Sequence, residues 1–321
     1  MKEARHGLAF NPVYLARKLR EIERFNKRAT DVSREDLEKA VERRLEGLRP
    51  LSHHFKGFVL DCACGYGADM LALSRLGDRK ELIGIDLAVE GLKRAGEELR
   101  RRGAVAHLVQ ADACWLPFRP GIFDAAIISH MLHHHPLPLI KAIVAEVSRV
   151  LRPGAFLLVR EWCPVDEGAS LREEVSVFLN QLAHLKELLR ELGELSSRPE
   201  VREAIYRHLP VFGFGSLFSS ILKNVLRACG LDILAFEMRR PQKRSLDELL
   251  KRARERIEDI PASGVEKAFL LARLEELEEK ARAIQADGEE AMVLVRAMKP
   301  PHLALDTRMP GKQTGYRTSS A

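Results

Sequence analysis

A glycine-containing turn follows an apolar segment near residue 60. The run is Val59-Leu60-Asp61-Cys62-Ala63-Cys64-Gly65-Tyr66-Gly67. Because Gly65 and Gly67 have no Cβ, the backbone can turn sharply there and a ligand can lie against it. The helix expected next supplies free N–H donors at its N-terminus. A dinucleotide site calls for a third glycine where this chain has Met70, and Asp61 would repel a diphosphate. The turn therefore favours a nucleoside that carries an amino acid.

Two more acids end the next two expected strands. Asp86 ends the segment Leu82-Ile83-Gly84-Ile85-Asp86, and Asp112 follows Val109-Gln110-Ala111. Asp86 is placed to accept hydrogen bonds from ribose hydroxyls, and Asp112 could accept one from an exocyclic amine. Any one acid could instead be a surface residue or a helix cap. Three acids ending consecutive parallel strands would share the carboxyl edge of one sheet, where ligands of such sheets bind.

A histidine cluster follows the fourth expected strand, in the run Ser129-His130-Met131-Leu132-His133-His134-His135-Pro136. Imidazoles titrate near neutrality, so two of them could steer or deprotonate a second substrate; loop histidines with structural hydrogen bonds are the alternative. No metal site is expected, because adjacent histidines point in different directions and no metal-ligand spacing accompanies them. Glu161 and Trp162 end the fifth expected strand and either line a substrate pocket or complete the strand end.

Short apolar runs alternate with helical segments through the middle of the chain, which predicts an α/β fold with a parallel sheet. Helices are also expected from Pro12 and, after a capping-box-like start at Ser33, up to Pro50. We expect strands at 57–61, 81–86, 105–110, 123–129, 154–161, 231–238 and 290–298, and helices at 67–77, 88–102 and 137–150.

Three helical stripes interrupt this alternation, with apolar residues at spacings of three and four. They run from Leu171 to Leu192, from Leu246 to Ile260 and from Leu270 to Ile284. Such seams could form a lid, a dimer contact or an ordinary bundle core. The expected organisation is a helical cap (1–50), a ligand-binding core (51–164), a helical lid insertion (165–228), two last strands (229–240 and 289–299), a second helical insertion (241–288) and a disordered tail (300–321).

The stretch 58–162 resembles the class I S-adenosylmethionine-dependent methyltransferases, and within them the ubiquinone/menaquinone-biosynthesis-like group, methyltransferase type 11. The matching motifs are Val59 to Gly67, Gly84-Ile85-Asp86, Ala111-Asp112-Ala113 with Leu116-Pro117-Phe118, Phe123-Asp124 through His134, and Arg149 to Gly154. They cover about a third of the chain. The resemblance implies a Rossmann-like, seven-stranded, mostly parallel sheet with an antiparallel last strand, plus a helical cap and insertions.

The resemblance also implies a role for individual residues. Asp61 and the Gly65–Gly67 turn would hold the methionine part of S-adenosylmethionine, Asp86 the ribose and Asp112 the adenine amine. Ser129 would line the methionine side, and Ala63, Leu87 and Ala113 would complete the cofactor site. Ala63 departs from the family, which has glycine there, and this implies a modest loss of turn freedom. His134 would be the first candidate for a catalytic role and His133 the second.

Composition limits the class of protein. The 321 residues carry a net charge of +6, which is concentrated in residues 1–50 and in the last 23 residues. Two solvated basic ends explain this better than a nucleic-acid-binding face. Neither an apolar run long enough to span a membrane nor a secretory signal is present. Five scattered cysteines indicate reduced thiols and a cytoplasmic location, and scarce Asn and Gln beside 31% charged residues hint at a thermophile.

The sequence thus predicts a methyltransferase that acts on a small-molecule acceptor, because a large helical lid suits a small or lipid-like substrate. The main alternative is an RNA (tRNA) methyltransferase, since similar cores modify tRNA and the N-terminal segment is basic. A non-catalytic cofactor-binding protein that docks through its helical seams is a third reading, and a homodimer through those seams is possible. A nicotinamide dehydrogenase is the weakest rival, because the third glycine is missing.

Overall fold

The computed structural model describes residues 12–77, 79–135, 137–164, 167–208, 219–243, 245–284 and 289–301. Its centre is a seven-stranded sheet with the strand order β3-β2-β1-β4-β5-β7-β6. The strands are β1 (Gly57–Cys62), β2 (Lys80–Asp86), β3 (Ala106–Gln110), β4 (Phe123–Ser129), β5 (Leu151–Pro164), β6 (Asp232–Lys243) and β7 (Glu289–Met298). Each expected strand is therefore present, and the largest difference in bounds is in β5 and β6, which run several residues longer.

The sheet is parallel from β3 to β5, and its last strand is antiparallel. β7 lies between β5 and β6 and runs opposite to both, so that Trp162 of β5 pairs with Met292 and Met292 also pairs with Arg239 of β6. The predicted mixed sheet with an antiparallel last strand is confirmed. The order reverses at β1, with β2 on one side and β4 on the other, which is where open α/β sheets bind ligands.

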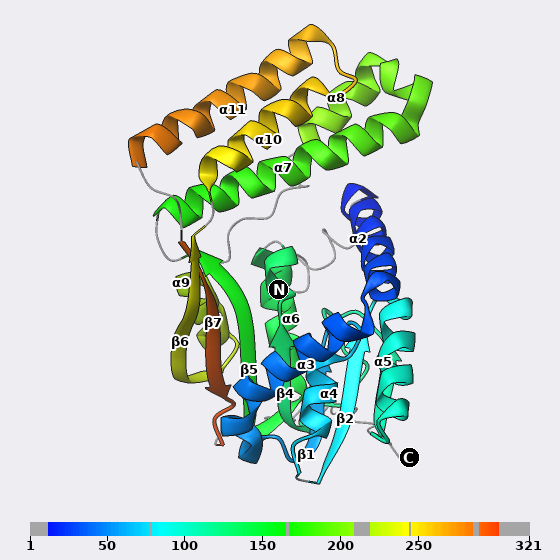
Figure 1. Ribbon diagram of the computed structural model, residues 1–321, viewed down its shortest axis with the longest axis vertical. Helices are drawn as coiled ribbons and strands as arrows, with labels where there is room; N and C mark the ends of the chain where they lie inside the picture. Colours follow the sequence, from blue (N-terminus) through cyan, green and yellow to red (C-terminus); the bar gives the residue numbers. More distant parts are fainter. Residues whose placement is uncertain are drawn as a thin grey trace, which may run out of the picture.

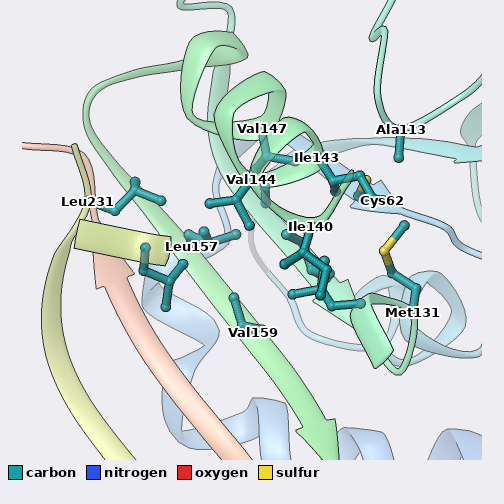
Figure 2. Packing of buried hydrophobic residues seen from close by; sticks show 14 of the residues in the cluster. Cys62, Ala113, Met131, Ile140, Ile143, Val144, Val147, Leu157, Val159 and Leu231 are labelled. Carbon is teal, nitrogen blue, oxygen red and sulfur yellow. The ribbon is translucent and has the colours of Figure 1, made fainter. Parts of the chain in front are cut away.

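Helices cover both faces of the sheet (Figure 1). One face is covered by α3 (Arg34–Leu48), α4 (Ala68–Ser74) and α5 (Val89–Arg101), through a core that includes Val41, Leu71 and Leu99. The other face is covered by α6 (Leu137–Val150) and α9 (Ser219–Ala228). Figure 2 shows Ile140, Ile143, Val144 and Val147 of α6 above Leu157 and Val159 of β5. The two buried faces fix the positions of the strand ends.

The N-terminal helix α2 (Pro12–Asp31) stands beside α5 in Figure 1, and α3 follows it. Ser33 caps α3 by accepting a hydrogen bond from the N–H of Asp36 at 3.1 Å, as expected from the sequence. α3 ends at Leu48, just before Pro50, as expected. Pro50 lies in the following 3-10 helix η1 (Arg49–His54), near its N-terminus, where proline costs no hydrogen bond. The helix expected at 67–77 is shorter, because α4 ends at Ser74.

The remaining helices form a bundle over the end of the sheet to which β5 leads (Figure 1). They are α7 (Glu167–Leu192), α8 (Pro199–His208), α10 (Leu246–Glu258) and α11 (Gly264–Ile284), with the 3-10 helix η3 (Gly193–Ser197) between α7 and α8. All three apolar seams lie in one shared core, which contains Val175, Leu182, Leu250, Ile257 and Leu274. The seams therefore bury one another, which is the bundle-core alternative.

None of the helices in the described ranges is apolar over a length that could cross a membrane. Most of the C-terminal segment expected to be disordered, residues 302–321, lies outside the described residues.

Candidate functional site

A cavity of roughly 820 Å³ opens at the carboxyl end of the parallel strands. Its walls come from the turn after β1, the loops after β2, β3 and β4, the ends of β5 and β7, and the inner faces of α2 and α3. A volume of this size matches a ligand pocket for a cofactor and a small substrate.

The glycine turn has three residues in the left-handed region. Gly65 has φ of +53°, Gly67 +84° and Ala63 +65°. A Cβ on Gly67 would come within 2.8 Å of the Ala95 Cβ, so this glycine lets α4 and α5 approach. A Cβ on Gly65 would meet nothing within 4 Å, and Gly65 lines the cavity. The left-handed conformation of Ala63 costs an L-residue about 1–2 kcal/mol. This cost is the physical form of the loss of turn freedom expected from alanine in place of glycine.

Asp86 joins the turn to the second strand end. Its Oδ2 accepts a hydrogen bond from the N–H of Gly65, and its Oδ1 accepts one from the N–H of Ala88, both at 2.8 Å. Burial raises the pKa of the Asp86 carboxyl, and these backbone donors act in the opposite direction. Each oxygen of a carboxylate has a second lone pair. The side chain is therefore fixed by the backbone and still able to accept from a ligand.

Asp112 is held by a cation from α2. The ammonium of Lys18 hydrogen bonds to Oδ2 of Asp112, while Oδ1 accepts from the N–H of Cys114 at 3.0 Å. Burial acts to raise the pKa of Asp112, but Lys18 outweighs it and the pKa lies below its ordinary value. The carboxylate that the resemblance assigns to the adenine amine thus already binds an amine of this chain.

A buried charge cluster forms part of the cavity lining. Asp69 of α4 bonds to Arg44 of α3 at 3.1 Å and to Arg160 of β5 at 3.0 Å. Burial opposes ionisation of Asp69, but the two guanidinium groups lower its pKa to about 2. The neighbouring Asp61 is 2% exposed, and burial followed by repulsion from Asp69 raises its pKa well above the usual value. Asp61 is not among the residues that line the cavity.

Three buried polar atoms near this cluster have no hydrogen-bond partner among the described residues. They are Oδ2 of Asp61, Oγ of Ser129 and Nδ1 of His130. Ser129 and His130 both line the cavity. Burial lowers the pKa of His130 to about 4, so its ring is neutral at pH 7. Because unpaired buried polar atoms cost free energy, this region is suited to the polar groups of a ligand.

His133 is held by a carboxylate that has no exposed surface. Nδ1 of His133 lies 2.7 Å from Oε2 of Glu161. The other oxygen, Oε1, accepts from the N–H groups of Met131 at 2.8 Å and Leu132 at 2.7 Å. Because Glu161 accepts these bonds as a carboxylate, Nδ1 of His133 carries the proton and Nε2 has the lone pair. His134 instead packs edge-on against Phe25, with ring centroids 5.4 Å apart.

An apolar wall lies beside the histidines. We call it the β5–β7 wall; it consists of Trp162, Met292 and Leu294, which all line the cavity. Trp162 and Met292 pair across the two strands, and Leu294 is 6% exposed. Arg239 of β6 continues the same row on the far side of Met292. An aromatic ring, a thioether and an aliphatic group in one row can bind an apolar substrate.

Most of the residues that the sequence singled out meet at this cavity. Its lining includes Ala63, Gly65, Asp86, Leu87, Asp112, Ala113, Ser129, His133 and His134, but neither Asp61 nor Gly67. Sequence reasoning missed Lys18, Arg44, Asp69 and Arg160. Two of these carried a signal, because Asp69 stands in the apolar segment Ala68–Ser74 and Arg160 follows five apolar residues of β5. A charged residue in such a segment indicates a buried ion pair.

Comparisons with known proteins agree with this architecture. Residues 59–154 match the model of the methyltransferase-domain family. A phthiotriol/phenolphthiotriol dimycocerosates methyltransferase of Mycobacterium tuberculosis is 32% identical over 158 residues, which are 48% of this chain and 56% of that protein. A demethylmenaquinone methyltransferase of Thermus thermophilus is 29% identical over 210 residues, covering 65% of this chain and 82% of that one.

The chain spans just over half the length of the mycobacterial relatives that it matches. Among solved structures, a candidate methyltransferase from Bacillus halodurans aligns with a TM-score of 0.52 at 19% identity, covering 80% of this chain and 98% of that one. This similarity shows a shared fold.

Proposed function

Because residues 59–154 match the methyltransferase-domain family, we propose that this chain transfers a methyl group from S-adenosylmethionine to a small-molecule acceptor. The observation that carries the proposal is the hydrogen-bonded pair of Gly65 and Asp86 at the switch point of the sheet, on the rim of a cavity of roughly 820 Å³. The relatives in mycobacteria and Thermus thermophilus, whose names are those of lipid and quinone methyltransferases, support it.

The residues present fit the cofactor. Gly65 leaves open space in which a ligand can lie against the backbone. Both oxygens of Asp86 keep a lone pair for ribose hydroxyls, and Asp112 can accept from the adenine amine once Lys18 releases it. Leu87 and Ala113 follow these acids and line the same part of the cavity. Ser129 and His130, with unpaired buried atoms, would face the methionine end.

Asp61 contributes to this site indirectly in our proposal. Its carboxyl group lies behind the lining, where burial favours the neutral form. Asp61 therefore acts on the turn only through its position in β1, directly before it. Gly67 acts on the turn by letting α5 pack close to it. The direct role of holding the methionine part falls to Ala63, Gly65, Ser129 and His130, all of which line the cavity.

When bound, S-adenosylmethionine supplies a methyl group already activated by a sulfonium. The chain must then exclude water and align the acceptor, and such orientation can lower a barrier by several kcal/mol. A base is needed only if the acceptor atom carries a proton at the working pH. We propose that His133 is this base. In the neutral ring Glu161 fixes the proton on Nδ1, so the lone pair is on Nε2, which would accept a proton from the acceptor. His134 then shapes the pocket through its contact with Phe25.

Isothermal titration calorimetry with S-adenosylmethionine tests the proposal. The wild-type chain should bind it, and Asp86→Ala should weaken binding by at least 1–2 kcal/mol, about 5- to 30-fold, through lost charged hydrogen bonds. Asp232→Ala, an exposed acid at the start of β6 outside the cavity, is the matched control and should change nothing. Absence of binding by the wild-type chain, or equal affinity of the Asp86→Ala variant, would contradict the proposal.

Other roles remain predictions. An RNA substrate would give binding that falls steeply with salt, which filter binding can measure. A non-catalytic cofactor-binding protein would bind S-adenosylmethionine and methylate nothing. A homodimer would have to use a surface other than the three seams, and analytical ultracentrifugation tests for it. A cytoplasmic location and a thermophilic source are likewise expectations from the sequence.

A further inference from the structure

Two arginines stand at the mouth of the cavity without an acidic partner. Arg28 of α2 and Arg43 of α3 are exposed, and both line the cavity. Neither forms an ion pair with any of the residues that the structure describes. By contrast, the nearby arginines Arg24, Arg34, Arg44 and Arg75 each pair with an acid. Glu21 and Glu46 also line the mouth, but neither pairs with Arg28 or Arg43. The mouth therefore offers two guanidinium groups to a ligand.

Another part of the lining of the same cavity is apolar. The β5–β7 wall presents an indole ring and a thioether, and Phe25 of α2 adds a second aromatic ring. Trp162 is half-buried and stacks at 6.4 Å on His130, so its ring is already held in place. A polar substrate without an apolar body would leave this surface in contact with water, which costs about 25 cal/mol per Å² of apolar area.

The β5–β7 wall lies at the end of β5 next to Glu161, which holds His133, and Arg28 and Arg43 line the same cavity from α2 and α3. Guanidinium groups bind phosphates and carboxylates through paired hydrogen bonds. A molecule that satisfies both the arginines and the wall must carry an anionic group at one end and an apolar body at the other.

We propose that the methyl acceptor is an amphipathic anion. Its anionic group pairs with Arg28 and Arg43, and its apolar body lies along the β5–β7 wall, where it reaches His133. This inference rests on the proposed function and narrows its substrate class, from any small molecule to a phosphate or carboxylate with an apolar chain or ring.

Tryptophan fluorescence tests the inference. The chain has two tryptophans, and Trp115 is 45% exposed outside the cavity, so Trp115→Phe leaves Trp162 as a single reporter in the wall. The probes are farnesyl phosphate, farnesol and farnesylamine, which share one apolar chain and differ in the charge of the head group. We expect farnesyl phosphate to bind at least 10-fold more tightly than farnesol, and farnesylamine to bind most weakly.

The double variant Arg28→Ala/Arg43→Ala, made in the Trp115→Phe background, should reduce the preference for the phosphate to less than threefold and leave farnesol binding unchanged. Arg100→Ala/Arg119→Ala removes two exposed arginines outside the cavity and should keep the full preference. Equal binding of the three probes, failure of all three to bind, or a preference that survives in the Arg28/Arg43 variant would overturn the inference.

Calorimetry with S-adenosylmethionine on the same proteins separates the two levels. If the cofactor binds and farnesyl phosphate shows no preference, only the substrate class is wrong. If the cofactor does not bind, the proposed function itself is contradicted. The thermal unfolding midpoint of each variant shows whether the chain is folded, so a loss of binding can be assigned to the site.

Discussion

The imidazole of His133 and the carboxylate of Glu161 form a hydrogen-bonded pair, with Nδ1 and Oε2 2.7 Å apart and the acid wholly buried. The pair connects the loop after β4 to the end of β5. Since Oε1 is occupied by two backbone N–H groups, only Oε2 is available to the ring. The backbone of the histidine loop thus determines which ring nitrogen faces the cavity.

Glu161→Gln should reverse the tautomer of His133. The amide oxygen can still accept from the two backbone N–H groups, but the amide NH₂ then donates to Nδ1 and the proton moves to Nε2. We expect ¹⁵N NMR to report this change, and methyl transfer to a proton-bearing acceptor to fall by about 10²–10⁴-fold at unchanged cofactor affinity. His134→Gln is the control and should leave the His133 tautomer as it is. An unchanged tautomer in Glu161→Gln would remove His133 from the role of base.

Lys18→Met should strengthen the binding of S-adenosylmethionine. In the structure the ammonium of Lys18 bonds to Oδ2 of Asp112, so the adenine amine would compete with it for the same carboxylate when the cofactor binds. Without that competitor we expect a several-fold lower Kd by calorimetry. Lys27→Met changes an exposed lysine on the same helix and should have no effect. Weaker binding by the Lys18→Met variant would show that the lysine assists the cofactor instead.

The two glycines of the turn should respond differently to alanine. Gly67→Ala brings a Cβ within 2.8 Å of Ala95 at φ of +84°, so it should lower the free energy of unfolding by more than the 1–2 kcal/mol of backbone strain alone. Gly65→Ala meets no protein atom within 4 Å and should cost only that strain, but its methyl group enters the cavity and should weaken cofactor binding. Urea unfolding and calorimetry on both variants separate the effects. Unimpaired binding by Gly65→Ala would exclude the cofactor from this turn.

His130 should make the fold less stable in mild acid. Its pKa is about 4 in the folded chain and 6.5 when unfolded, so the unfolded chain binds more protons between these values. Stability is therefore full above pH 6.5 and falls as the pH drops toward 4, by roughly 3 kcal/mol. Asn tolerates the left-handed φ of +53° found at this residue.

Urea unfolding between pH 7 and pH 4 should thus show a smaller loss in His130→Asn than in the wild-type chain. The wild-type chain and the variant share their other titrating groups, including Asp61 and Asp86 with their raised pKa values, so the difference between the two curves reports on His130. Parallel curves for the two proteins would mean that the ring is not buried as the structure has it.

Local patterns predicted every strand and most helices of this chain, because each strand contains a short apolar run and those helices have an apolar stripe; α8 and α9 were not predicted as separate helices. The edge that collects Asp86 and Asp112 followed from topology alone, since parallel strands end on one side of the sheet. Asp61 shows where this reasoning stops. Its place at a strand end was right, but the alternation of side chains along β1 turns it toward Asp69 and Arg44, under the lining.

Contacts between segments far apart in the chain could not be predicted from the sequence. Lys18 and Asp112 are 94 residues apart, and nothing in either neighbourhood indicates that α2 crosses the rim. The same holds for Arg44 and Arg160, which reach Asp69 from different elements. Long-range ion pairs depend on how helices pack on the sheet, and a single sequence has no period or motif that encodes this packing.

The position of β7 has a consequence for the order in which the chain can assemble. In the finished sheet β7 lies between β5 and β6, but the ribosome synthesises β7 after both of them. Until residues 289–298 emerge, both neighbours have an unpaired edge, and such edges are prone to pair with other chains. The wall that Met292 and Leu294 complete is accordingly the last part of the cavity to form during synthesis, after the rim of acids is already in place.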